Sequence, residues 1–193
     1  DSASEKPDAK NTTKKKPARK PPAKSAKAEA ATPNWIWHSA DGKPAERVYF
    51  RKEVNSSGVG AARLYAACDV SMKIYIDGKL LIEHENPEKP VFVDISDELD
   101  LDAAQKDHVI AVEATGGKSS AGLLVKLDLE SGWRDAWSIV TDDSWLVSAQ
   151  AAKGWKEVAF KAGKSWQKPE IVAALGGGAW ATTINAVTLA AAA

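Results

Sequence analysis

The chain has 193 residues, enough for one domain of ordinary size with a tail. Its formal charge is zero, but residues 1–30 hold nine Lys/Arg and four Asp/Glu, so residues 31–193 carry a net −5. An acidic body disfavours binding to nucleic acid, which needs clustered basic side chains to meet phosphates. The single cysteine, Cys68, excludes an intramolecular disulfide and a thiolate metal cluster. No run approaches the roughly 20 apolar residues that span a bilayer, so a membrane-spanning protein is not expected.

Residues 1–33 contain almost nothing that could be buried, because they consist mainly of Lys, Ala, Pro, Ser and Glu. Such a segment cannot recover the entropy lost on ordering, so we expect a disordered linker. We interpret it as a solvated spacer; the alternative is an arm that binds anionic polymer, cell wall or lipid headgroups. The chain begins at Asp1 instead of Met, and removal of a secretory signal peptide is the explanation we favour. A secreted, periplasmic or cell-surface location is therefore expected.

From Asn34 onward, short segments with period-two alternation are separated by Gly, Asp, Asn and Pro, and no long helical pattern is seen. In chain order, strands are predicted at 48–54, 62–68, 72–76, 80–85, 91–95, 108–114, 123–129, 137–141 and 145–148. The sequence Asp77-Gly78 supplies the positive φ values of a type I′ turn and predicts a hairpin. Residues 96–101 are expected to form one helical turn, and the last two strands to pair around Asp142-Asp143.

Many short strands with frequent turn signals favour an all-β protein, a sandwich or a barrel. A parallel sheet is not expected, because it would need long helical crossovers. The sandwich is predicted to span residues 34–182, with the turn-rich sequence after Ser148 wrapped around it. The Ala-rich residues 183–193 are predicted to begin a C-terminal linker, with more protein beyond.

The order of the motifs resembles galactose-binding-like modules. The matching segments are 35–37, 48–52, 62–69, 74–79, 109–114, 121–124, 141–145 and 154–155. Such modules stand at the N-terminus of bacterial rhamnosidase-type glycosidases and of large secreted planctomycete haem or dehydrogenase-like proteins. The resemblance covers most of residues 34–180 and implies an antiparallel jelly-roll β-sandwich (galactose-binding-like) that acts as an accessory domain. Departures from the family pattern at 101–107 and 161–164 lie in loops, where they bear on ligand or ion contacts.

No catalytic set is found in the sequence, so the protein is predicted not to be an enzyme. His38, His84 and His108 are dispersed and lack zinc-site spacing. Gly117-Lys118-Ser119 is similar to the end of a phosphate-binding loop, but Val112 occupies the position of the loop's first glycine. No Gly-x-Ser-x-Gly elbow occurs.

The one cofactor considered is a structural calcium ion. Asp97, Asp100 and Asp102 have an oxygen-rich spacing that could reach such an ion, although the glycine and closing glutamate of an EF-hand loop are missing. Galactose-binding-like sandwiches often carry a structural calcium, so the resemblance adds to this prediction.

Eight tryptophans are the main indication of function, because flat indole faces stack on sugar rings. Five or six of them are expected to pack inside the protein. Trp35 and Trp37 alternate along the first strand of the domain, which precedes the strand at 48–54, so one is expected in the core and the other at the surface. Trp133 and Trp137 flank a polar turn that includes Arg134, and these three residues are predicted to bind the ligand.

A second candidate rim is the loop 85–90. Asn86 and Glu88 offer amide and carboxylate groups that suit sugar hydroxyls. The ligand is therefore predicted to be a polysaccharide or glycan, of a kind that the sequence leaves open.

Two functions follow as hypotheses. The first is a non-catalytic carbohydrate-binding-type module that tethers a larger secreted protein to polysaccharide. The second is a structural accessory domain that docks on a downstream catalytic or haem/dehydrogenase-like domain of the same polypeptide without binding a sugar.

Overall fold

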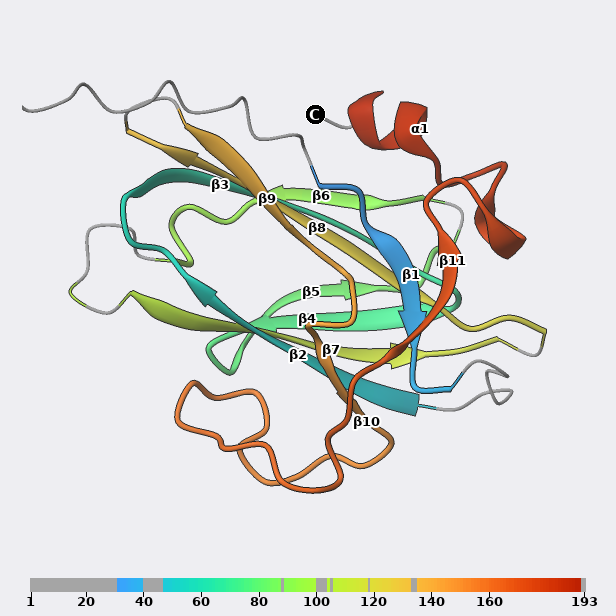
Figure 1. Ribbon diagram of the computed structural model, residues 1–193, viewed down its shortest axis with the longest axis horizontal. Coiled ribbons are helices and arrows are strands. Elements are labelled where there is room, and N and C mark those ends of the chain that lie inside the picture. Colours follow the sequence, from blue (N-terminus) through green and yellow to red (C-terminus); the bar gives the residue numbers. More distant parts are fainter. Residues whose placement is uncertain are drawn as a thin grey trace, which may run out of the picture.

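The protein is a sandwich of two β-sheets, seen in a computed structural model that describes residues 31–39, 47–87, 89–99, 104, 106–117, 119–132 and 135–191 (Figure 1). The predicted tail, residues 1–33, lies outside this part except for its last three residues. The strands are β1 (Asn34–Trp37), β2 (Arg47–Asn55), β3 (Val59–Cys68), β4 (Ser71–Ile76), β5 (Lys79–His84), β6 (Val91–Asp94), β7 (Asp107–Thr115), β8 (Leu123–Ser131), β9 (Ala136–Val140), β10 (Leu146–Ser148) and β11 (Glu170–Ala174). Two short helices follow, η1 (Gly178–Trp180) and α1 (Ala186–Ala191).

All strand pairs are antiparallel, as predicted. Sheet A has the order β11-β1-β8-β3-β6, with β9 also paired to β8. Sheet B has the order β10-β2-β7-β4-β5. Within the described residues, no helix is long and apolar enough to cross a bilayer.

The main core lies between the sheets, and the period-two pattern of the strands explains it. Leu64, Phe50 and Ile74, for example, point inward and are fully buried. Alternation brings one side of each strand into this core and leaves the other side as an outer face. Cys68 belongs to the same core, and its burial raises the pKa of the thiol to about 12. The thiol therefore acts as a small apolar group.

The predicted hairpin at Asp77-Gly78 is confirmed. β4 pairs with β5, and the two turn residues have φ values of 49° and 86°. These values lie in the left-handed region that the type I′ turn requires, where Gly and Asp are the favoured residues.

The last two predicted strands do not pair with each other. β9 pairs with β8 in sheet A, whereas β10 pairs with β2 in sheet B. The chain crosses between the sheets here because the indole of Trp145 enters the core and donates a hydrogen bond to Val140 O at 2.8 Å. The polar Asp142-Asp143 is thus a corner between layers, although its composition is typical of a hairpin turn. β11 was not predicted, and it pairs with β1 at the edge of sheet A.

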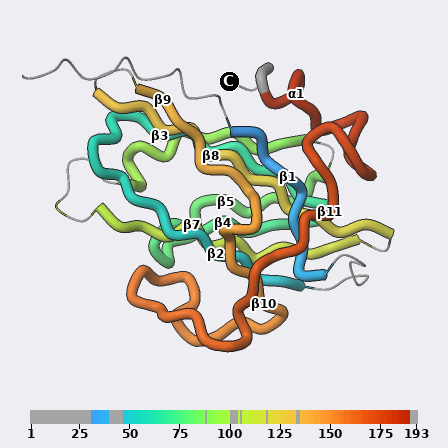
Figure 2. The backbone as a smooth tube through the Cα atoms, viewed as in Figure 1, coloured from blue at the N-terminus to red at the C-terminus, as the bar shows by residue number. Residues whose placement is uncertain are grey.

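The C-terminal segment covers part of the outer face of sheet A (Figure 2). Trp180 stacks on Trp35 with ring centroids 4.0 Å apart, and Ile184 and Leu189 are buried in the same cluster. Packing therefore continues beyond residue 182, where the sequence prediction ended the sandwich. A side chain at Gly122 would lie 2.6 Å from the Trp180 ring, so this close contact requires a glycine.

This cover also explains why the prediction for the first strand was wrong. Trp35 and Trp37 are both fully buried, because β1 has the main core on one side and the C-terminal segment on the other. Six tryptophans are buried in the described part, in line with the prediction of five or six: Trp35, Trp37, Trp145, Trp155, Trp166 and Trp180.

The loop between β10 and β11 covers the outer face of sheet B, as the predicted wrapping required. Its anchor is Arg51, which is buried and donates hydrogen bonds to Trp155 O at 3.0 Å and Glu157 O at 2.9 Å. Trp155 packs edge-on against Tyr49 beneath it. The guanidinium has enough donors to bind several carbonyl groups at once, so one side chain fixes the loop.

Replacement of Trp180 by alanine tests the role of the C-terminal segment. Trp180→Ala removes the ring that covers Trp35, and we expect it to lower the free energy of unfolding by about 3 kcal/mol or more. Urea unfolding followed by tryptophan fluorescence measures the change. The control is Val187→Ala on α1, whose side chain is 75% exposed and which should change stability by less than about 0.5 kcal/mol. Equal stability of the two variants would contradict a packing role for Trp180.

Candidate binding face

Of the three ligand-binding residues predicted around residue 135, only Trp137 lies in the described part; Trp133 and Arg134 lie outside it. Trp137 sits opposite Leu129 on the inner side of sheet A, where it is partly buried against the main core. It was predicted to be an exposed stacking residue. Because its neighbour Ser138 faces outward instead, the indole is on the wrong side of the strand for that role.

The second candidate rim is only partly described. Asn86 is exposed, and its backbone oxygen accepts a hydrogen bond from His84 Nε2 at 2.7 Å. The same ring nitrogen lies 3.0 Å from Lys89 O, so His84 closes the loop from within. Glu88 lies outside the described residues.

The predicted calcium ligands cannot be assembled from the described residues. Asp97 is exposed in the turn after β6, and Asp100 and Asp102 lie outside the described part. Among the residues that the structure describes, no three His, Cys, Asp or Glu side chains are grouped so that they could hold a metal ion.

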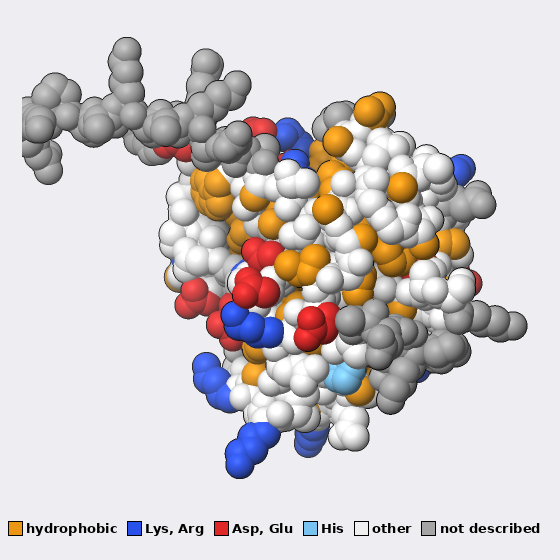
Figure 3. Space-filling view, turned by 45° about the vertical axis from the view of Figure 1, so that its right-hand side comes forward, with side chains coloured by type: hydrophobic (Ala, Val, Ile, Leu, Met, Phe, Trp, Pro, Cys, Tyr) orange, Lys and Arg blue, Asp and Glu red, His pale blue; other side chains and the backbone are white. Residues whose placement is uncertain are grey.

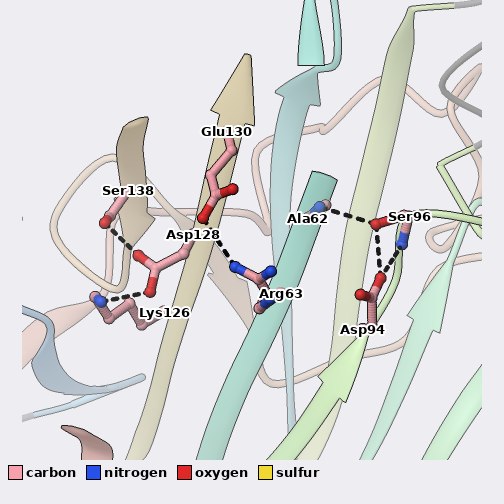
Figure 4. Close-up of polar contacts among 8 residues, drawn as sticks. All are labelled: Ala62, Arg63, Asp94, Ser96, Lys126, Asp128, Glu130 and Ser138. Atoms are coloured by element: carbon pink, nitrogen blue, oxygen red, sulfur yellow. Dashed lines mark hydrogen bonds and ion pairs between the residues drawn. The ribbon is translucent and has the colours of Figure 1, made fainter. Parts of the chain in front are cut away.

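The structure instead brings polar side chains together on the outer face of sheet A (Figure 4). Asp94 on β6 is opposite Arg63 on β3, Arg63 is opposite Asp128 on β8, and Asp128 is opposite Ser138 on β9. We call these four residues the polar row. They occupy directly paired positions, so the row crosses four neighbouring strands.

A second row lies two residues along the strands. Phe92 is opposite Tyr65, Tyr65 is opposite Lys126, and Lys126 is opposite Val140. We call this set the aromatic row. The rings of Phe92 and Tyr65 are 4.8 Å apart, and Lys126 Nζ lies 5.5 Å from the centre of the Tyr65 ring. Tyr65 and Val140 are buried, whereas Phe92 is 39% exposed and offers an accessible aromatic surface beside the polar row.

Ion pairs and hydrogen bonds fix the polar groups of this face. Arg63 pairs with Glu130 at 2.8 Å, and Lys126 pairs with Asp128 at 2.6 Å. The second oxygen of Asp128 accepts a hydrogen bond from Ser138, as Figure 4 shows. Each group is thus held by a neighbour, yet Arg63 and Glu130 remain 39% and 49% exposed. The polar atoms are ordered before any ligand arrives.

The pKa values of two groups on this face are shifted. Hydrogen bonds from the hydroxyl and backbone N–H of Ser96 hold the pKa of Asp94 below its usual range. Burial, with a smaller contribution from Asp128, raises the pKa of Tyr65. Asp94 is therefore ionised and the Tyr65 phenol neutral across a wide range of pH.

We call the polar row, the aromatic row and Glu130 together the binding face. Sequence reasoning missed it, although a strand was predicted at 62–68 and alternation puts Arg63 and Tyr65 on the same side of such a strand. The missing information was which strands would lie next to β3.

One arrangement on the other sheet has the hydrogen-bond order of a serine hydrolase. His108 Nδ1 lies 2.7 Å from Asp77 Oδ2, and His108 Nε2 lies 3.2 Å from Ser56 Oγ. A surface cavity of about 320 Å³ lies beside His108. Ser56, however, is fully buried, so its hydroxyl cannot reach a substrate carbonyl. The three side chains connect two turns to the start of β7.

The fold is a β-sandwich of two antiparallel sheets, and solved structures with the same fold confirm the resemblance at the level of fold. No protein-family model matches the chain, and no curated protein matches it.

Solved structures resemble this chain in fold. Streptomyces avermitilis α-L-rhamnosidase, complexed with L-rhamnose, is 24% identical with a TM-score of 0.70; the match covers 82% of this chain and 16% of that one. Pleurotus ostreatus lectin in its apo form is 21% identical with a TM-score of 0.65, over 77% of this chain and 43% of that one. The same lectin has a structure in complex with GalNAc, with a TM-score of 0.64. The chain thus spans about a sixth of the rhamnosidase and less than half of the lectin.

The structural role of the His108 network can be tested by mutation. His108→Ala leaves buried polar groups without their partner, so we expect the free energy of unfolding to fall by about 1–3 kcal/mol. His108→Asn can still donate to Asp77 and should lose less. Urea unfolding measures both, with His38→Ala as a control outside the network. A fluorophosphonate that labels the wild type but not Ser56→Ala would show instead that Ser56 is a reactive nucleophile.

Proposed function

We propose that this protein is a non-catalytic carbohydrate-binding module that tethers a larger secreted protein to polysaccharide through the outer face of sheet A. The observation that carries the proposal is the exposed Phe92 beside an ordered row of charged and hydroxyl groups on one flat sheet. Sugars offer both an apolar ring face and a rim of hydroxyls, so a matching surface needs both kinds of group.

The exposed ring of Phe92 suits the apolar side of a sugar ring. The C–H groups of a pyranose are slightly positive and are attracted to the negative face of an aromatic ring. Phe92 has no polar atom, so its exposed surface lacks any hydrogen-bonding partner in the protein. The Phe92 ring already packs against Tyr65, which excludes water from that side. A sugar that stacks on the ring therefore displaces water only from its exposed side.

The polar row suits hydroxyl groups. Carboxylates accept hydrogen bonds, the Arg63 guanidinium donates them, and the Ser138 hydroxyl does both. Hydrogen bonds to charged groups are stronger than those between neutral ones. Because ion pairs already fix these side chains, a ligand has little conformational entropy to remove when it binds.

The similar structures support this proposal at the level of the fold. One is a lectin solved with GalNAc, and another is a rhamnosidase solved with L-rhamnose, in which the matched part is a small share of the whole chain. The small matched share of the rhamnosidase agrees with the proposal that this chain is a module of a longer secreted polypeptide and has no active site of its own.

The alternative is that the module docks on another domain of the same polypeptide. The feature that favours it is the exposed apolar surface near the C-terminal segment, where Ile171 on β11 is 53% exposed and Val187 on α1 is 75% exposed. Figure 3 looks onto this side, where hydrophobic side chains are interspersed with backbone and other uncharged atoms, drawn in white. Among the described residues, the other large exposed apolar side chains belong to other segments: Val70, Leu80 and Phe92. Such scattered side chains argue against a continuous apolar patch for docking on another domain.

Affinity gel electrophoresis against neutral polysaccharides tests the proposal. We expect retardation of the wild type by at least one of galactan, xylan, mannan and β-glucan. Phe92→Ala should weaken that binding about tenfold, because stacking surface is lost. Arg63→Met should weaken it by a similar factor through the loss of charged hydrogen bonds.

Matched controls separate this face from other sites. Leu80→Ala removes an apolar side chain from sheet B that is 53% exposed, more than Phe92, and should leave binding unchanged. The double variant Trp133→Ala, Trp137→Ala examines the ligand site predicted from the sequence. If binding disappears there and persists in Phe92→Ala, the outer face of sheet A is the wrong site. Failure to bind any glycan of a broad array would remove the sugar-binding function itself.

A further inference from the structure

We propose that the binding face holds an internal stretch of a neutral glycan chain, lying across the strands, instead of a single terminal sugar. This inference rests on the proposed function and specifies its ligand. It follows from the length of the polar row, from what borders the row and from how its charges are paired.

The polar row is longer than one sugar ring. It crosses three inter-strand gaps, from Asp94 on β6 to Ser138 on β9. With about 4.8 Å between neighbouring strands, its length is about 14 Å. Hydroxyl-binding groups therefore continue across the sheet for the length of a short oligosaccharide.

The direction of the chain follows from what borders the face. Along the strands, the next outward-facing positions are Ala67 and Leu124, which lie buried under Trp180 and Ile184 of the C-terminal segment. A ligand that ran along the strands would meet this covered region. Across the strands the polar row is accessible, because Asp94 is exposed and the side chains of Arg63 and Asp128 are 39% and 27% exposed, so the chain is expected to follow the polar row.

The two ends of the row lie on outermost strands. β6 pairs only with β3, and β9 pairs only with β8. No described strand stands beyond either of them to close the row. A glycan chain can therefore continue past both ends, as an internal stretch of polysaccharide must, whereas recognition of a terminal sugar requires a wall that stops the chain.

The charges of the face favour a neutral glycan. Three carboxylates, Asp94, Asp128 and Glu130, stand against two cations, Arg63 and Lys126, and both cations are already paired with a carboxylate. A uronic acid or sulfate group would have to separate such a pair while facing the remaining carboxylates. Neutral hydroxyls can bind to the paired groups without separating them.

Isothermal titration calorimetry of the 193-residue chain with oligosaccharides tests the inference. The probes are the mono- to hexasaccharides of β-1,4-galactan, β-1,4-xylan, β-1,4-mannan and β-1,3-glucan, with polygalacturonate as the acidic counterpart. We expect affinity for the favoured series to rise at least tenfold from the mono- to the trisaccharide and then to level off. Polygalacturonate should bind at least tenfold more weakly than the neutral polymer.

Substitutions at the ends of the row add a second readout. Asp94→Asn and Ser138→Ala should lower the affinity for the trisaccharide severalfold and change that for the monosaccharide little. Ser119→Ala, an exposed serine in the loop between β7 and β8, is the matched control.

The outcomes separate this inference from the proposed function. Equal affinity for mono- and trisaccharide would overturn the chain-binding inference and leave sugar binding intact. Tighter binding of polygalacturonate than of the neutral polymers would show that the ligand is not a neutral glycan. If none of the acidic and neutral probes binds, the result counts against both the inference and the proposed function. A rise in affinity with chain length supports both.

Discussion

The stack of Trp180 on Trp35 determines which part of the surface is left to bind a ligand. β3 is buried on both sides from Leu64 to Cys68, so one sheet of the sandwich has two apolar faces over part of its length. The C-terminal segment buries the outer apolar face, and the rings of Trp35 and Trp180 lie 4.0 Å apart within this contact. What the segment does not cover is the remainder of that face, where the side chains become charged. The boundary between cover and open surface is thus set by packing.

The cover and the ordered polar groups are linked at Asp69. Its carboxylate accepts hydrogen bonds from Trp180 Nε1 at 2.9 Å, from Ser120 Oγ at 2.6 Å and from Gly117 N at 2.6 Å. One acidic residue at the end of β3 therefore joins the C-terminal segment to the loop between β7 and β8. Because the same strand carries Arg63, the cover and the open face share a rigid support. A rigid support of this kind lowers the entropic cost of binding.

Most of the fold could be predicted from the sequence, because strands and turns are local signals. The alternation in β2, β7 and β8 and the Asp77-Gly78 turn depend only on neighbouring residues, and all of them are present in the structure. The crossing at Asp142-Asp143 could not be predicted, because a polar turn looks alike whether it closes a hairpin or joins two sheets. Trp37 faces the main core, but the burial of Trp35 on the other side of β1 depends on its contact with Trp180, some 145 residues away, for which alternation carries no information.

The site was less predictable than the fold for the same reason. The polar row draws its members from four strands that are far apart in the chain, and only the strand order places Asp94 beside Arg63 and Asp128 beside Ser138. Counting tryptophans directed attention to Trp137, yet its position on β9 turns it toward the core. Large aromatic residues are scarce on an open sheet face and frequent in a core. A high number of tryptophans therefore predicts buried positions better than it predicts a binding site.

The anchoring of the loop over sheet B has a consequence for variation among related sequences. Arg51 binds the carbonyl oxygens of Trp155, Glu157 and Phe160, and every amino acid carries such an oxygen. Side chains on the exposed side of this loop can therefore change freely while the attachment is preserved. New surface chemistry could arise there by drift, without any adjustment inside the sandwich.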